Sequence, residues 1–176
     1  MRTTLPCVCV LLAAAMTAAA DPPKAPPKPT ADDFYGVWIE ERREAGGKAE
    51  TDPFHLLGWD LAAADGGCWE RRGESVYTSF GKLRVRTDKD PFWLDIIGET
   101  YKEKVGDGWV EKVSIRPGIV KLDGKKLVWV WADRWYAGTP KEIADWSRRP
   151  ASFDVKKDDQ WEKMTLYRGS GRYAQD

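Results

Sequence analysis

The most regular alternation of apolar and polar positions lies in the segment 116–131, RPGIVKLDGKKLVWVW, where two apolar runs flank Asp123-Gly124. Aspartate and glycine tolerate the positive φ angles of a two-residue type I′ turn, whose twist matches that of the strands it joins. The segment therefore predicts a β-hairpin that places Leu122 opposite Lys125. One face of this hairpin carries Val120, Leu122, Leu127, Trp129 and Trp131.

Similar short runs of β-branched and aromatic residues recur along the chain, with turn clusters about every 8 to 15 residues. This spacing is typical of an all-β sandwich or barrel. The predicted strands are Gly36 to Arg42, Phe54 to Leu61, Cys68 to Arg72, Lys82 to Thr87, Phe92 to Ile97, Trp109 to Ile115, Ile119 to Leu122, Lys126 to Trp131, Ala151 to Val155 and Trp161 to Arg168.

One segment, 139–146, has the chemistry of a helix start instead. Thr139 can cap the first amides, and Pro140 suits the first helical position. Glu142 stands three residues after the cap and completes a T-x-x-E capping box. The sequence thus predicts a short helix that connects the last strands.

The first twenty residues follow the pattern of an export signal. A basic residue stands near the start, an apolar stretch covers residues 5–16, and residues 18–20 are all alanine, an A-x-A cleavage pattern. Residues 21–30 then contain five prolines, which favour an extended spacer. We therefore expect a signal peptide at 1–20, a proline-rich linker at 21–30 and an exported protein, either periplasmic or extracellular.

The charge balance argues against nucleic acid as a partner, because 28 basic and 28 acidic residues leave no basic excess. After the predicted signal, no apolar stretch approaches the roughly 18 to 20 residues that a membrane span needs. Cys68 is the only cysteine beyond residue 20, so we expect no internal disulfide and a fold held by its hydrophobic core. Ten tryptophans supply much of the apolar area of that core.

Several short motifs follow one another along about 135 residues. They are Gly36-Val37-Trp38; Gly66-Gly67 with Arg71-Arg72-Gly73; Asp88-Lys89-Asp90-Pro91 with Leu94-Asp95; Gly118-Ile119-Val120-Lys121-Leu122-Asp123-Gly124 with Leu127; Arg149-Pro150-Ala151-Ser152-Phe153; and Leu166-Tyr167-Arg168. In order and spacing the chain resembles the planctomycete family of exported, uncharacterised domains with a lipocalin-like barrel. The resemblance implies an all-β fold, a lipocalin-like antiparallel β-barrel with one short helix near the C-terminal strands, and it implies no activity. The barrel domain is then expected at 31–168, and a flexible tail at 169–176.

The resemblance also assigns a structural role to two residues. In lipocalin-like barrels a G-x-W tryptophan packs at the closed end, and a basic residue of the last strand crosses its face. Trp38 and Arg168 match these positions. A cation–π pair of this kind would tie the first strand to the last.

Two further tryptophans, Trp129 and Trp131, share the predicted interior face of the hairpin. One interpretation makes them the lining of an aromatic ligand cavity. The other makes them part of a filled core, because side chains often fill small barrels completely. Both interpretations stay open on the sequence alone.

The segment 133–148 departs from the family pattern, because it is longer and richer in aromatic residues than the resemblance leads us to expect. Aromatic faces stack on sugar rings or apolar ligands, and arginine forks bind carboxylates or phosphates. The candidate recognition surface comprises Arg134, Trp135, Tyr136, Trp146, Arg148 and Arg149. In the alternative interpretation, the capped helix covers one barrel end and buries its indoles there.

The sequence carries no recognisable catalytic or metal-binding constellation. His55 is the only histidine, and no G-x-S-x-G elbow exists, so neither a two-histidine metal site nor a familiar triad is predicted. We predict no cofactor, no metal and no catalytic residue. Cys68 is expected to be a semi-buried strand thiol, with an intermolecular bridge as the alternative.

These observations favour a noncatalytic module. The first hypothesis is a barrel that binds a small apolar or amphipathic molecule, or that serves as an interaction module of the cell envelope. The second is a carbohydrate-binding module that uses exposed tryptophans as stacking platforms, and an enzyme comes third. The oligomeric state stays open.

Overall fold

The computed structural model describes residues 27–51, 57–62, 66–72, 76–157 and 159–169. The predicted signal peptide, most of the linker, His55 and nearly all of the tail lie outside these residues. The strands are β1 (Gly36–Ala45), β2 (Lys48–Thr51), β3 (Leu57–Leu61), β4 (Gly67–Arg72), β5 (Val76–Arg86), β6 (Phe92–Val105), β7 (Gly108–Arg116), β8 (Gly118–Asp123), β9 (Lys126–Ala132), β10 (Tyr136–Gly138) and β11 (Trp161–Arg168). A 3₁₀ helix, η1 (Ala31–Phe34), precedes β1, and the helix α1 (Pro140–Ala144) follows β10.

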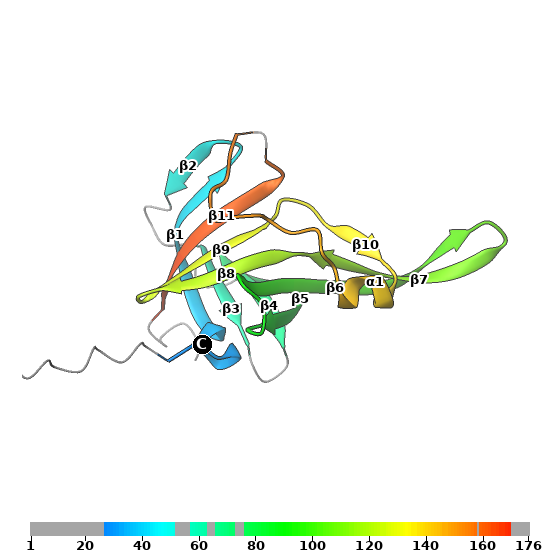
Figure 1. Ribbon diagram of the computed structural model, residues 1–176, viewed down its shortest axis with the longest axis horizontal. Helices are drawn as coiled ribbons and strands as arrows, with labels where there is room; N and C mark the ends of the chain where they lie inside the picture. Colours follow the sequence, from blue (N-terminus) through cyan, green and yellow to red (C-terminus); the bar gives the residue numbers. More distant parts are fainter. Residues whose placement is uncertain (1–26, 52–56, 63–65, 73–75, 158, 170–176) are drawn as a thin grey trace, which may run out of the picture.

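Eight antiparallel strands close into a barrel in the order β6-β5-β4-β3-β1-β11-β9-β8 (Figure 1). The ring closes where β8 returns to the start of β6, through the pairs Phe92 with Val120 and Trp93 with Ile119. Closure leaves these strands without an open edge in the barrel wall. The predicted fold class, a lipocalin-like antiparallel β-barrel with one short helix, is therefore confirmed.

Strand β6 is much longer than the predicted strand, which ended at Ile97. Its second half leaves β5 after the pair Lys82 with Ile97 and continues with β7 as a two-stranded hairpin. This hairpin projects away from the barrel (Figure 1). Two short strands that the sequence did not predict also join the sheet, β10 beside β7 and β2 beside β1.

The predicted strand from Ala151 to Val155 is wrong. The backbone there forms bends, and the hydroxyl of Ser152 accepts a hydrogen bond from the amide of Asp154 at 3.2 Å. Such a local side-chain bond offers the backbone an alternative to a sheet ladder.

The hairpin at Asp123-Gly124 forms, but its register differs from the prediction by two residues. Leu122 lies opposite Leu127 rather than Lys125, and Gly124 takes a positive φ of 62° in the turn. This register pairs one large apolar side chain with another. Because side chains alternate with a period of two, the difference leaves the faces unchanged, and Val120, Leu122, Leu127, Trp129 and Trp131 share one face as predicted.

Helix η1 closes one end of the barrel. The indole of Trp38 donates a hydrogen bond to the carbonyl of Phe34 at 2.9 Å, and both side chains are buried. The Arg168 guanidinium lies 5.0 Å from the Trp38 ring centre and donates to the carbonyls of Asp33 and Tyr35. Trp38 and Arg168 therefore join the first and last strands of the barrel.

Helix α1 begins after Thr139 as predicted, with the reciprocal bonds of a capping box between Thr139 and Glu142. It does not cover a barrel end, which corrects one of the two interpretations of this segment. Ile143 packs with Val113 and Ile115 of β7 in a cluster separate from the barrel interior. Ile115 pairs with Ile97, and Ile97 faces away from the interior because its neighbour Ile96 faces in. The helix therefore packs on the outer face of the sheet.

Candidate functional site

Three indoles fill the centre of the barrel. Trp59 meets Trp131 edge to face with ring centres 5.1 Å apart, and Trp129 lies 4.9 Å from Trp131. Trp129 and Trp131, which the sequence proposed as ligand-binding residues, are 0% and 2% exposed. The Trp129 indole also donates to the carbonyl of Leu94 at 3.2 Å. An apolar ligand could reach the centre of the barrel only by displacing these packed rings.

Charged side chains lie on the inner face of the wall beyond the indoles, toward the end opposite η1. Arg43 donates two hydrogen bonds to the buried carboxylate of Glu40, at 3.0 and 2.8 Å. Burial lowers the pKa of Arg43, but the hydrogen bond and charge of Glu40 outweigh that effect and raise it. Glu162 accepts a hydrogen bond from the Trp131 indole at 3.1 Å. The barrel is therefore apolar at its closed end and polar toward the other.

Arg116 connects this charged layer with the surface. Its guanidinium lies 4.5 Å from the ring centre of Trp131, in the interior, and 5.5 Å from that of Trp135, which is exposed. Burial lowers its pKa, and the nearby charges of Glu162 and Asp133 act in the opposite direction. One Nη donates to the backbone carbonyl of Asp133 at 2.8 Å, which holds the start of the Trp135 segment against β7.

A hollow of about 1000 Å³ opens beside Trp135, in the angle where β5 separates from the β6–β7 hairpin. Its walls come from β4, β5, β6, β7 and the segment between β9 and β10. The lining residues are Gly67, Trp69, Ser79, Phe80, Gly81, Lys82, Ile97, Gly98, Glu99, Thr100, Tyr101, Ser114 and Trp135. Trp69, Tyr101 and Trp135 thus stand among hydroxyl, ammonium and carboxylate groups. Phe80, the fourth aromatic residue of the lining, packs on Trp59 and Trp131 and joins the hollow to the barrel interior.

Two glycines shape this hollow. Gly81 has a φ of 127°, and a Cβ there would collide with the backbone carbonyl of Ile97. At Gly98 a Cβ would collide with the hydroxyl of Ser114 and the ring of Trp135. Gly81 therefore lets β5 bend away close to β6, and Gly98 lets the Trp135 ring lie directly on the β6 backbone. Glycine in a strand often marks such close approaches.

The structure does not bring the six predicted recognition residues together into one surface. Only Trp135 lines the hollow. Tyr136 and Trp146 pack together over α1 with ring centres 5.7 Å apart, and Arg134 and Arg148 meet at Gln160. Arg149 lies in a third place, which is a buried ion-pair network.

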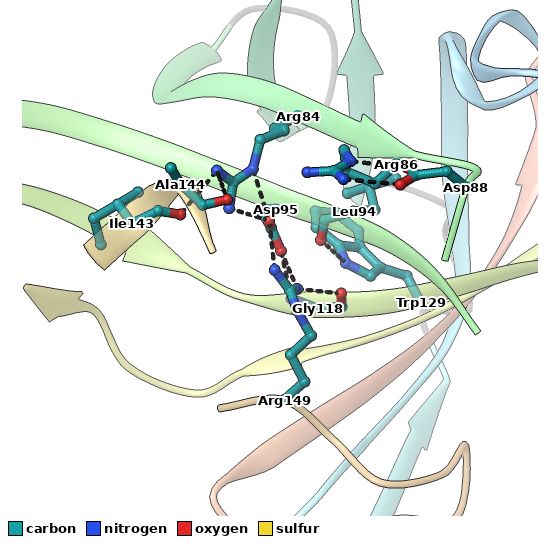
Figure 2. A network of polar contacts seen from close by, with 10 residues as sticks. All are labelled: Arg84, Arg86, Asp88, Leu94, Asp95, Gly118, Trp129, Ile143, Ala144 and Arg149. Carbon is teal, nitrogen blue, oxygen red and sulfur yellow. Dashed lines mark hydrogen bonds and ion pairs between the residues drawn. The ribbon is translucent and has the colours of Figure 1, made fainter. Parts of the chain in front are cut away.

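That network has Asp95 at its centre (Figure 2). The Asp95 carboxylate is fully buried and accepts hydrogen bonds from Arg84 at 2.8 and 3.0 Å and from Arg149. It also accepts from the amide of Gly118 at 3.1 Å, and Arg149 lies 3.6 Å from the ring centre of Trp93. Arg84 reaches on to the carbonyl of Ile143 at 2.8 Å. The network therefore ties α1 and the chain after it to the outer wall of the barrel.

Sequence reasoning did not predict that Asp95 lies at the centre of an ion-pair network, and it missed most of the residues that line the hollow. The signal for Asp95 was present, since a carboxylate between Leu94 and Ile96 takes the face opposite to theirs on a strand. Its arginine partners come from positions 84 and 149, and only the fold brings them together. For the hollow no comparable local signal exists, because four strands and one connecting segment contribute to it.

Among the described residues, no group of three or more His, Cys, Asp or Glu side chains could hold a metal ion. In the same part of the chain, no helix has the length and hydropathy to cross a membrane. Comparisons with family models, curated proteins and solved structures find no significant match. The class of protein therefore rests on the fold itself, a lipocalin-like antiparallel barrel with packed indoles at its centre and a hollow between β5 and the β6–β7 hairpin.

Proposed function

We propose that this protein is an exported, noncatalytic barrel that binds a small amphipathic molecule in the hollow beside Trp135. The observation that carries the proposal is the lining of this 1000 Å³ space, in which aromatic rings alternate with polar groups. Ligand pockets combine apolar and aromatic walls with a few polar groups that fix orientation. The packed centre of the barrel supports this location, because Trp129 and Trp131 occupy the place where a lipocalin-like ligand would otherwise lie.

Among amphipathic molecules, a saccharide fits the lining best. A sugar ring has an apolar face that stacks on an aromatic ring, and its hydroxyls donate and accept hydrogen bonds at the edge. Trp135 and Tyr101 are 38% and 44% exposed and offer such faces. Ser79, Ser114 and Glu99 supply hydroxyl and carboxylate partners around them. A long alkyl chain would find no enclosed apolar channel in this open hollow.

Titration calorimetry with neutral oligosaccharides, a fatty acid and a retinoid tests the proposal. We expect oligosaccharide binding that Trp135→Ala weakens about tenfold or more, the effect of losing an aromatic anchor. Trp109→Ala is the matched control, because Trp109 is 67% exposed and lies on the hairpin outside the hollow. Equal losses in both variants, or no binding of any of these ligands, would contradict the proposal.

A second variant addresses the risk that Trp135→Ala perturbs the fold. Ser79 lines the hollow and is exposed, so Ser79→Trp fills the space without removing a buried contact. We expect this variant to keep the thermal stability of the wild type and to lose the oligosaccharide. Undiminished binding by a stable Ser79→Trp protein would place the ligand elsewhere.

A further inference from the structure

Two exposed arginines converge on one side-chain oxygen outside the hollow. The Nη2 atoms of Arg134 and Arg148 donate to Oε1 of Gln160 at 2.7 and 3.0 Å, and the hydroxyl of Tyr136 donates to the same oxygen at 3.0 Å. Both guanidinium groups also lie over the ring of Tyr136, with their Cζ atoms 5.5 and 5.0 Å from its centre. None of these four residues lines the hollow.

The acceptor at this point is poorly matched to its donors. An amide oxygen has two lone pairs and no charge, yet three donors, two of them cationic, are directed at it. Among the described residues, neither arginine forms an ion pair with a carboxylate. Tyr136 makes the largest contribution that raises the pKa of Arg134, and among the described residues Asp133 is the only carboxylate that adds to it through its charge. Two like charges therefore meet at a neutral centre.

We propose that Arg134 and Arg148, with Tyr136 and Gln160, form a binding site for an oxyanion: a carboxylate, sulfate or phosphate group. Such a group offers more lone pairs than the amide and a charge opposite to that of both arginines. Guanidinium forks bind planar oxygen pairs through two parallel hydrogen bonds, and these charge-assisted bonds are shorter and stronger than neutral ones. Because both arginine side chains are exposed, their remaining N–H groups can reach an anion from solvent. This site stands independently of the proposed saccharide hollow.

The competing interpretation is a purely structural clasp, in which the arginines only hold the segment around Tyr136 against Gln160. The two interpretations differ in what a carboxylate at position 160 would do. If the positive charges lack a counterion, Gln160→Glu supplies one inside the protein. It should then raise the melting temperature in chloride buffer and remove the binding of external anions.

Calorimetric titration with sulfate, inorganic phosphate and glucuronate, at ionic strength held constant with chloride, tests the proposal on the full chain. We expect at least one of the three to bind, and its identity tells which oxyanion the site prefers. Arg134→Gln and Arg148→Gln should each weaken binding about tenfold or more, the effect of losing one charge-assisted hydrogen bond. Arg42→Gln is the matched control, because its side chain is 50% exposed and lies on β1.

Binding that survives in Arg42→Gln and disappears in the other two arginine variants supports the site. The same loss in all three variants would show nonspecific charge attraction and overturn it, as would the absence of binding by all three anions. Gln160→Glu retains both arginines, so it tests the site even if the arginine variants fold poorly. A Gln160→Glu protein that binds the anion as the wild type does would also overturn the proposal.

Discussion

The structure predicts a large loss of stability for the substitution Asp95→Asn. Asp95 is fully buried and is the counterion that Arg84 and Arg149 share. The Arg149 side chain is only 6% exposed. Asparagine keeps the shape but removes the charge. It also replaces one acceptor oxygen with an NH₂ group that faces two guanidinium donors. The substitution therefore leaves a buried positive charge without a counterion and donors without acceptors.

The size of the effect follows from this loss. Removing one partner of a buried ion pair destabilises a protein by about 3–5 kcal/mol, because the other charge stays buried and unpaired. In a chain of 176 residues each kcal/mol lowers the melting temperature by roughly 2–4 °C. We therefore expect Asp95→Asn to melt roughly 6–20 °C below the wild type. A stability of 5–15 kcal/mol leaves room for a folded variant.

Urea denaturation followed by near-UV circular dichroism measures the loss in free energy of unfolding. Asp88→Asn is the matched control. Asp88 forms a similar 2.8 Å pair with Arg86, but on the surface, where solvent screens it. We expect its midpoint to stay near that of the wild type. A midpoint for Asp95→Asn as close to the wild type as that of Asp88→Asn would refute the argument from buried charge.

A double-mutant cycle separates charge from packing at the same site. Arg149→Met removes the buried cation and keeps much of the aliphatic stem that packs near Trp93. The double variant with Asp95→Asn lacks the buried guanidinium of Arg149, and only Arg84, whose side chain is 23% exposed, is left without its carboxylate. Its loss should therefore be smaller than the sum of the two single losses. Strict additivity would mean that Asp95 acts through its shape and not through its charge.

Three other outcomes follow from the structure. Trp38→Ala should destabilise the protein by about 3–5 kcal/mol in chemical denaturation, because the ring is buried between Phe34 and Arg168. Glu142→Gln should lower the melting temperature at neutral pH only. Hydrogen bonds from Thr139 lower the Glu142 pKa from its ordinary 4.5. The stabilisation that the Glu142 carboxylate contributes is therefore fully present above pH 4.5 and is lost as the pH falls through the folded pKa. Burial raises the pKa of the Cys68 thiol, so peptide mass spectrometry should find Cys68 unlabelled by iodoacetamide at pH 8 in the native protein and labelled after denaturation.

The parts of the fold that the sequence predicted correctly depend on local rules. Helix α1 needed only the capping chemistry of Thr139 and Glu142, which lie three residues apart. The shared face of the β8–β9 hairpin needed only a period of two. Its register needed more, because a slip of two residues preserves that period and only the pairing of Leu122 with Leu127 distinguishes the alternatives.

The β6–β7 hairpin could not be predicted to its full length, for a physical reason. Beyond the pair of Thr100 with Val113 both faces of the hairpin meet solvent, so Lys102, Glu103 and Lys104 follow one another without apolar alternation. The pattern that identifies a half-buried strand is absent where nothing is buried. The pair of Asp95 with Arg149 could not be predicted for a different reason. Its two members are 54 residues apart in the sequence, and no local rule links them.

The filled interior and the external hollow are two consequences of one constraint. An eight-stranded barrel encloses space for side chains or for one small ligand. In this chain, with its single cysteine after residue 20, the indoles of Trp59, Trp129 and Trp131 take that space and supply the apolar core. The proposed binding surface lies beside this packed centre instead, and the extension of β6 beyond Ile97 provides one side of the hollow. The Asp95 network fixes α1, the bond from Arg116 fixes the chain before Trp135, and between these two anchors Trp135 is held against Gly98 at the edge of the hollow.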